Sequence, residues 1–234
     1  MEVHNHSHTP RKKWTHYFWE FLMLFLAVFA GFLAENFREH LIEHRKENNF
    51  VRSLLEDLKK DTASLNYSIR RITGNIRSAD SLNFLFEKGN KEKDYELRMS
   101  RFGQNAGHSV DIVFNDRTSS QLKGTGSMRL IRKKVVADSI AQYWNNQIKI
   151  AQIHDRYEAF RMEQRKMGWK TFSWYRDSSL NNDRIINEQM LSEFVSCTTS
   201  LYTSGIWQFL PELQKELALA KNLILLIGEE YHMQ

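Results

Sequence analysis

The feature that most constrains this chain is the apolar run from Tyr17 to Ala34, YFWEFLMLFLAVFAGFLA. Its eighteen residues contain one charge, Glu20, and none from Phe21 onward. An α-helix of this length spans roughly 27 Å, close to the ~30 Å hydrocarbon core of a bilayer. The run therefore predicts a transmembrane helix at 17–34, with a short polar His/basic tail at 1–16 and an extramembrane domain at 35–234.

Aromatic side chains mark the N-terminal edge of the run. Trp14, Tyr17 and Trp19 gather there, as expected at a membrane interface. Glu20 lies about one turn inside this edge. An acid within a membrane segment is a candidate functional residue, and the other interpretation is an interfacial acid that reaches back to the headgroups.

Small residues on the run indicate a possible helix–helix contact. They lie four apart, at Ala27 and Gly31 and at Ala30 and Ala34. Such spacing lets two membrane helices approach closely. The expected partners are therefore the lipid bilayer and, in addition, a second copy of the chain or another membrane protein.

A cleaved signal peptide is the alternative interpretation of the run. Arg11, Lys12 and Lys13 form a basic region before it, and a cut after Ala30 would fit the small-residue preference. The apolar run continues to Ala34 without a polar cleavage region, which favours an uncleaved signal-anchor. Both interpretations deliver the rest of the chain to the same side.

The orientation depends on the charges beside the run. Within about twenty residues, three Lys and Arg residues precede it and four follow it, so the positive-inside count does not decide. The three that precede it are contiguous on a very short tail, which resists translocation. We therefore expect the tail inside and the C-terminal domain outside.

The totals exclude several classes of protein. The net charge is +5, but the charges alternate in sign instead of forming blocks, so a nucleic-acid partner is not expected. Cys197 is the sole cysteine and can form neither an intramolecular disulfide nor a cysteine-based metal site. No proline occurs between Pro10 and Pro211, which favours long helices.

A heptad pattern dominates the region after the run. Residues 35–88 indicate one long helix, and 95–114 a short helix and a loop. The predicted seam of the long helix is Val51, Leu55, Leu58, Thr62, Leu65, Ile69, Ile72, Ile76 and Ala79. Further amphipathic helices are predicted at 128–172, with Val135, Ile140, Tyr143 and Ile148 on the apolar face, and at 185–202 and 211–231.

These patterns predict an all-α fold. The transmembrane helix would continue into an elongated antiparallel helical bundle with coiled-coil-like long helices. The seam would be buried, either by the chain's own later helices, which are long enough to cover it, or by a second copy in a parallel coiled coil.

The sequence HLIEH, His40 to His44, matches the inverted zinc-protease signature. On a helix, His40 and His44 share a face, and Glu43 could act as a base. Polar flanks and the absence of a recognisable third ligand argue against catalysis here. The tail adds four histidines that could capture a metal, His4, His6, His8 and His16, although nothing nearby would complete a fixed geometry.

A basic turn follows the sequence GTGS at 124–127, which lacks the Gly-Lys-Ser/Thr ending of a P-loop. If a helix begins at Met128, its first turns carry Arg129, Arg132, Lys133 and Lys134. Helix N-termini favour anions, and cations there oppose the helix dipole, so helix stability does not explain the cluster. The turn is a candidate site for an anion or an acidic partner; the alternative is a solvated interhelical turn.

Two blocks of the sequence resemble a family of uncharacterised bacterial membrane proteins. They are WEFLMLFLAVFAGFLAENFREH, with RSLLEDLKKD after it, and SSQLKGTGSMRLIRKKVVADSIAQYW. The matching positions are Asn36, Phe37, Glu39, Leu122, Gly126, Arg129, Leu130, Ile131 and Arg132, and the ending IGEEYHMQ is also similar. The family usually has tryptophan where Phe37 stands. The resemblance implies a single-pass protein of the bacterial inner (cytoplasmic) membrane, with a helical domain and no established activity.

We therefore expect a membrane-anchored, non-enzymatic scaffold or interaction module without a cofactor. One alternative is a sensor-like bundle that binds a small anionic ligand at the basic turn and acts through a membrane partner. A remote alternative is a zinc-dependent hydrolase that uses His40, Glu43 and His44.

Overall fold

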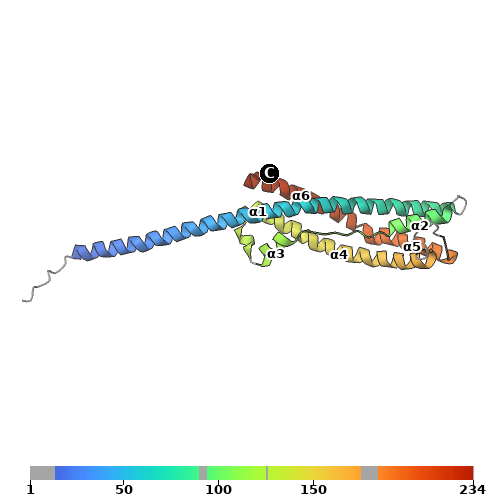
Figure 1. Cartoon of the computed structure of the whole chain (residues 1–234), viewed down its shortest axis with the longest axis horizontal. Coiled ribbons are helices and arrows are strands. Elements are labelled where there is room, and N and C mark those ends of the chain that lie inside the picture. The colour runs from blue at the N-terminus through green and yellow to red at the C-terminus, as the bar shows by residue number, and fades with distance from the viewer. Residues whose placement is uncertain (1–13, 90–93, 125, 175–183, 234) are drawn as a thin grey trace, which may run out of the picture. The chain divides into compact units, whose positions relative to one another are not determined.

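A computed structural model describes residues 14–89, 94–124, 126–174 and 184–233. The described residues are helical almost throughout (Figure 1). The helices are α1 (Trp14–Lys88), α2 (Tyr95–Ala106), α3 (Arg117–Gly124), the 3₁₀ turn η1 (Ser127–Leu130), α4 (Lys134–Thr171), the 3₁₀ turn η2 (Glu188–Met190), α5 (Leu191–Ser200), the π-helical turn η3 (Leu201–Ile206) and α6 (Phe209–Tyr231). The predicted all-α fold is confirmed.

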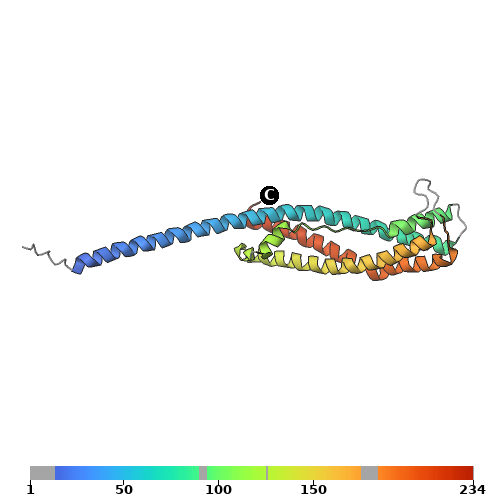
Figure 2. The same ribbon diagram turned by 60° about the horizontal axis from the view of Figure 1, so that its bottom comes forward.

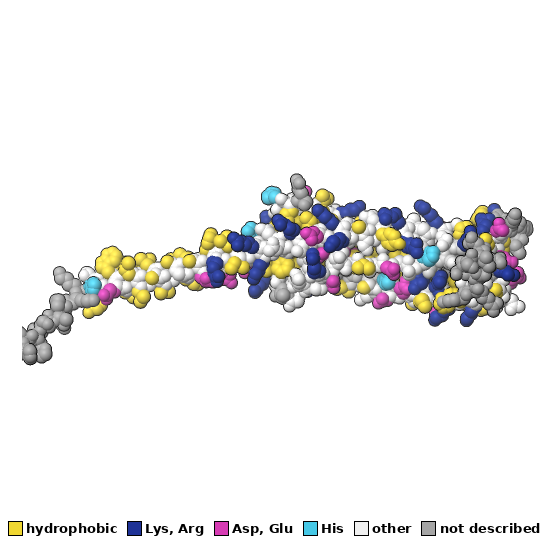
Figure 3. All heavy atoms as spheres, in the orientation of Figure 1, with side chains coloured by type: hydrophobic (Ala, Val, Ile, Leu, Met, Phe, Trp, Pro, Cys, Tyr) yellow, Lys and Arg dark blue, Asp and Glu magenta, His cyan; other side chains and the backbone are white. Residues whose placement is uncertain are grey.

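The chain divides into two compact units, Met1–Asn48 and Asn49–Gln234. In the first unit, the described residues belong to α1 and form one continuous helix. The helix passes through Ala30 without interruption. Its apolar side chains are solvent-exposed, as the space-filling view shows (Figure 3).

The second unit is an antiparallel bundle in which the described residues run along four legs (Figures 1 and 2). The first leg is α1 from Asn49 onward; the second is α2, the extended residues 108–116 and α3; the third is α4; the fourth is α5, η3 and α6. Asn146 contacts Glu216 and Lys133 contacts Glu230, which fixes α4 and α6 as antiparallel. Consecutive legs run in opposite directions.

The first leg buries its heptad seam against the chain's own helices. Val51 and Leu58 pack with Ile140 of α4 and Leu223 of α6 in one apolar cluster. Further along, Leu65 and Ile72 pack with Ile153, Tyr157, Phe209 and Leu213. Six of the nine predicted seam positions are buried and three, Thr62, Ile69 and Ile76, are half-buried. Intrachain packing of the seam is therefore confirmed.

The prediction for α4 was less accurate. Ile140 and Tyr143 are buried as expected, but Val135 and Ile148 are 60% and 57% exposed. The face that α4 turns inward instead includes the polar residues Asn146 and Gln164. The prediction that Val135 and Ile148 face the interior rested on their apolar character alone, and it was wrong.

Two helix boundaries differ from the prediction. The helix expected from about Met128 begins at Lys134, because η1 and an extended stretch precede it. A start at Met128 would have gathered cations at the positive end of the helix dipole. The helix expected at 185–202 is α5, which continues through η3 almost directly into α6, where Pro211 lies in the first turn as predicted. Proline is tolerated there because first-turn N–H groups have no helical partner.

Candidate functional site

One helix in the described residues is long and apolar enough to cross a membrane. It is α1, whose most apolar eighteen-residue window has a mean hydropathy of 1.9 and is not buried within the structure. Large side chains such as Phe21, Leu24 and Phe32 are about two-thirds exposed. The exposed surface of this window is far more apolar than an ordinary protein surface.

Glu20, the acid within this segment, has a local partner. Its Oε1 lies 3.0 Å from Nε2 of His16, one turn toward the N-terminus. Both side chains are about half exposed. The pair matches the interpretation of Glu20 as an acid that reaches back toward the edge of the apolar run.

The zinc-signature residues lie on the exposed surface of α1. His40 and His44 are exposed and Glu43 is half-exposed. Nδ1 of His44 lies 3.5 Å from Oε2 of Glu47. Within the described residues, no group of three or more His, Cys, Asp or Glu side chains has the geometry to hold a metal. His4, His6 and His8 lie outside the described residues, and the zinc hypothesis stays a prediction.

The basic turn is a solvent-facing connection between α3 and α4. Arg129, Arg132, Lys133 and Lys134 are all exposed. Arg129 lies in η1, while Arg132 and Lys133 precede α4, so the predicted clustering within the first turns of a long helix is wrong. Gly126 takes a left-handed conformation with φ 62°, which glycine adopts without strain. Nζ of Lys133 lies 3.0 Å from Glu230 of α6, which ties the turn to the end of the fourth leg.

A ladder of polar side chains on α1, which the sequence analysis did not identify, holds the second leg. Asp61, Ser68 and Asn75 are buried on α1 beside the predicted heptad seam, seven residues apart. Asp61 Oδ1 accepts a hydrogen bond from the backbone N–H of Asn115, at 2.8 Å. Ser68 donates to the carbonyl of Asp111, and Asn75 donates to the carbonyl of His108, each at 2.9 Å.

The spacing of this ladder has a geometric basis. Seven helical residues rise about 10.5 Å, and three residues of extended backbone span about 10 Å. From Asn75 to Ser68 the helix therefore advances as far as the extended chain does from His108 to Asp111. One polar side chain per heptad can thus satisfy the backbone of the extended segment, which has no strand partner in the described residues.

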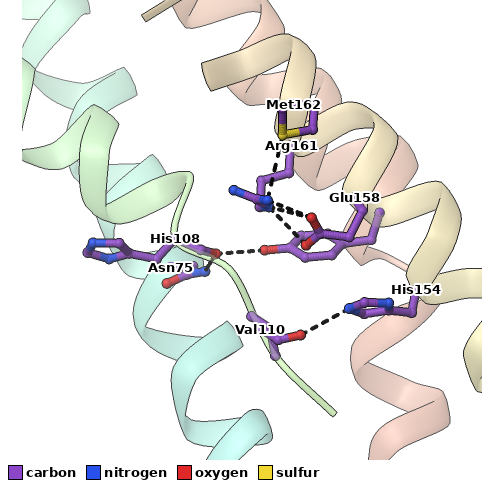
Figure 4. A network of polar contacts seen from close by, with 8 residues as sticks. Asn75, His108, Val110, His154, Glu158, Arg161 and Met162 are labelled. Atoms are coloured by element: carbon purple, nitrogen blue, oxygen red, sulfur yellow. Dashed lines mark hydrogen bonds and ion pairs between the residues drawn. The ribbon is translucent and has the colours of Figure 1, made fainter. Parts of the chain in front are cut away.

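α4 holds the same segment from its other side (Figure 4). The hydroxyl of Tyr157 donates to the His108 carbonyl at 2.9 Å, the acceptor that Asn75 also uses. Nε2 of His154 lies 3.1 Å from the carbonyl oxygen of Val110. Burial raises the pKa of Tyr157, so its hydroxyl stays protonated and can donate. The extended segment is therefore clamped between α1 and α4.

Asp61 and Glu216 are two of the acids buried in the half of the bundle nearer Asn49. Asp61 Oδ2 accepts a hydrogen bond from the Tyr143 hydroxyl at 2.7 Å, and burial raises the pKa of Asp61. Glu216 of α6 is fully buried and accepts from Nδ2 of Asn146 at 2.9 Å. Its other oxygen has no hydrogen-bond partner among the described residues, and burial raises its pKa to about 8.

Cys197 has the properties of an unreactive thiol. It is half-buried on α5 and forms no disulfide. Burial raises its pKa, and Glu163 and Glu193 add to the shift. Because the thiolate is the nucleophilic form, a raised pKa lowers reactivity at neutral pH.

Comparison of the chain with protein-family models, with curated proteins and with solved structures finds no match. The resemblance carried by residues 19–40, 52–61, 119–144 and 227–234 therefore stays a prediction. The arguments for function come from the apolar helix, the basic turn and the polar interior of the bundle.

Proposed function

We propose that the protein is a membrane-anchored, non-enzymatic interaction module. The apolar segment at 17–34 anchors it, and the bundle at 49–234 is its interaction domain. The observation that carries the proposal is that no residue in the apolar window of α1 is buried within the structure, since such a surface is stable in a bilayer and not in water. The apolar run continues past Ala30 to Ala34 without a polar cleavage region, which supports an uncleaved anchor.

Carbonate extraction of membranes from cells that express the full chain tests the anchor. We expect the chain to stay in the membrane pellet, and a variant with Leu24→Asp and Val28→Asp to shift toward the soluble fraction, because charges at the centre of a membrane helix are costly. Release of the unaltered chain by carbonate would contradict the proposal.

We further propose that the tail faces the cytoplasm of a bacterium and that the bundle lies outside the inner membrane. The basic tail at 11–13 supports this orientation. Protease added to spheroplasts should then digest the bundle, while protease added to inverted membrane vesicles should leave it intact. The reverse pattern would place the bundle in the cytoplasm.

A self-contact through the small residues of the anchor is part of the proposal. Gly31 has no heavy atom of the chain within 4 Å of the position a Cβ would take, so this face is open to a partner. Cross-linking in membranes should detect a dimer that Gly31→Ile weakens, because a large side chain prevents close approach of the helices. Leu33→Ile, on the same helix, is the control.

A sensor-like role is the second candidate, and the basic turn favours it. Arg129 and Lys134 are exposed and have no ion-pair partner among the described residues. An anion could therefore bind there without displacing an existing salt bridge. A thermal-shift screen of the full chain with anionic ligands would support this role if a shift disappears in Arg129→Ala, and would count against it if no ligand gives a shift.

A further inference from the structure

A cleft lies at the end of the bundle where α1 enters the second unit. Its volume is about 460 Å³, within the usual range for a small-ligand site. It is lined by Arg52, Leu55, Glu56, Lys59, His232 and Met233. These residues come from two turns of α1 and from the residues that follow α6. None of the basic-turn residues lines it.

The cations of this cleft are available to a ligand. Arg52 and Lys59 are exposed, lie seven residues apart and so share one face of α1. Neither side chain, nor that of His232, has a hydrogen-bond or ion-pair partner among the described residues. Lys133, at the same end of the bundle, is already paired with Glu230. The cleft therefore presents charge that the fold itself does not neutralise.

Two negative contributions reduce this charge without cancelling it. Glu56 lines the cleft, and the guanidinium of Arg117 lies 3.8 Å from its carboxylate and 3.5 Å from that of Asp57, so Arg117 offsets these two acids only in part. The C-terminal end of α6 adds about half a negative charge. Arg52 and Lys59 together outweigh these terms, so the cleft attracts an anion.

The remaining surface of the cleft is apolar. Leu55 is 6% exposed and Met233 is half-buried. A guanidinium binds phosphate through two parallel hydrogen bonds, and an ammonium adds a compact charge. An imidazole supplies one more hydrogen bond. Cationic groups around an apolar floor fit a phosphate group attached to a small carbon skeleton.

We propose that this cleft binds a phosphate ester, held by Arg52 and Lys59 with His232, with the carbon skeleton against Leu55 and Met233. A phosphate ester of this kind occurs both as a soluble metabolite and as the headgroup of an anionic phospholipid. The assignment does not depend on the basic turn. Binding of a soluble phosphate ester is independent of the proposed membrane anchor, whereas binding of a lipid headgroup rests on it.

The test uses the purified full chain and two probes. The first probe is glycerol 3-phosphate, titrated in neutral detergent by isothermal calorimetry. The second is the melting temperature in nanodiscs of phosphatidylcholine alone or with phosphatidylglycerol. The variant is Arg52→Gln with Lys59→Gln. The matched control is Lys60→Gln with Arg70→Gln, which removes two exposed charges from the same helix outside the cleft.

Binding of glycerol 3-phosphate that weakens about tenfold or more in the variant but not in the control would assign a soluble ligand, since each charged hydrogen bond contributes roughly that factor. Stabilisation by phosphatidylglycerol alone, lost in the variant and kept in the control, would assign a lipid headgroup. If neither probe has an effect, or if variant and control respond equally, the proposal is overturned. Circular dichroism of the variant verifies that the exposed substitutions leave the bundle folded.

Discussion

The hydroxyl of Tyr143 on α4 donates a 2.7 Å hydrogen bond to the carboxylate of Asp61 on α1. The other oxygen of the same carboxylate accepts from the backbone and side-chain amides of Asn115. One buried acid therefore joins three consecutive legs of the bundle. Because burial raises the pKa of Asp61 while these donors lower it, the donors keep a charged acid tolerable in the interior.

We expect Tyr143→Phe to lower the melting temperature by several degrees. The substitution leaves a buried carboxylate oxygen without its donor, which costs about 1–3 kcal/mol. Tyr67→Phe is the matched control, since Tyr67 is 58% exposed. Thermal melts followed by circular dichroism measure both, and equal melts for the two variants would show that the Tyr143 bond does not contribute.

A second prediction follows from the two hydrogen bonds that the His108 carbonyl oxygen accepts. Asn75 and Tyr157 both donate to the same carbonyl oxygen, so either residue alone can satisfy it. Removing both leaves this part-buried carbonyl without either donor. We expect the double variant Asn75→Ala, Tyr157→Phe to be less stable than the sum of the single variants predicts, by about 0.5–3 kcal/mol.

Urea denaturation of the four proteins in the cycle measures this coupling. Ser68→Ala combined with Tyr157→Phe is the control, because Ser68 binds a different carbonyl, that of Asp111. Strict additivity in the Asn75 cycle would show that the two donors do not depend on each other.

The heptad pattern predicted the first leg well because its large apolar residues follow one face. Leu58, Leu65 and Ile72 are buried as expected. The pattern also placed Ile69 and Ile76 on this face, and these residues are only half-buried, whereas their neighbours Ser68 and Asn75 are buried. Polar residue type normally indicates a solvent-facing position, so the pattern shifted to the nearest apolar neighbours. These polar side chains are buried because they hydrogen-bond to the extended segment of the second leg. The sequence pattern did not predict that this segment packs against α1.

The candidate sites were harder to predict. The positions of Arg129 and Lys133 on the surface follow from their charge, but the cleft beside Arg52 and Lys59 depends on His232 and Met233, more than 170 residues away in the sequence. Spacing along the chain carries no information about such a contact. Likewise, Glu216 stands among the charged residues of an amphipathic helix, and only the packing of α4 against it shows that it is buried.

Stability should fall as the pH rises, through Glu216. Its pKa is raised from an ordinary 4.5 to about 8 by burial. Between these values the folded protein binds more protons than the unfolded chain, so the contribution of Glu216 is fully present below pH 4.5 and is lost as the pH approaches 8. Glu216→Gln, which stays neutral, should remove this loss, by up to about 1.4 kcal/mol per pH unit in that window.

Melting temperatures of the unaltered chain and Glu216→Gln at pH 5, 6.5 and 8 measure the effect. We expect the variant to gain stability relative to the unaltered chain at each step. Glu229→Gln, an exposed acid on the same helix, should follow the unaltered chain. A constant difference between Glu216→Gln and the unaltered chain at all three values would show that Glu216 does not titrate in this range.

Two helical glycines should respond to alanine in opposite directions. At Gly168 of α4, an added Cβ would lie 2.1 Å from the ring of Trp174. That ring stacks on Phe172 at 5.5 Å and donates to the Ser100 hydroxyl at 2.8 Å, so it cannot move without losing these contacts. At Gly74 of α1, by contrast, no heavy atom lies within 4 Å of the Cβ position.

Gly168→Ala should therefore destabilise the bundle by about 1–3 kcal/mol, the usual cost of overpacking. Gly74→Ala should stabilise it by up to about 1 kcal/mol, since alanine favours the helix more than glycine does. Urea denaturation followed by circular dichroism gives both values. If Gly168→Ala stabilised the protein as much as Gly74→Ala, helix propensity would outweigh packing at position 168. That result would contradict the close contact between Trp174 and α4.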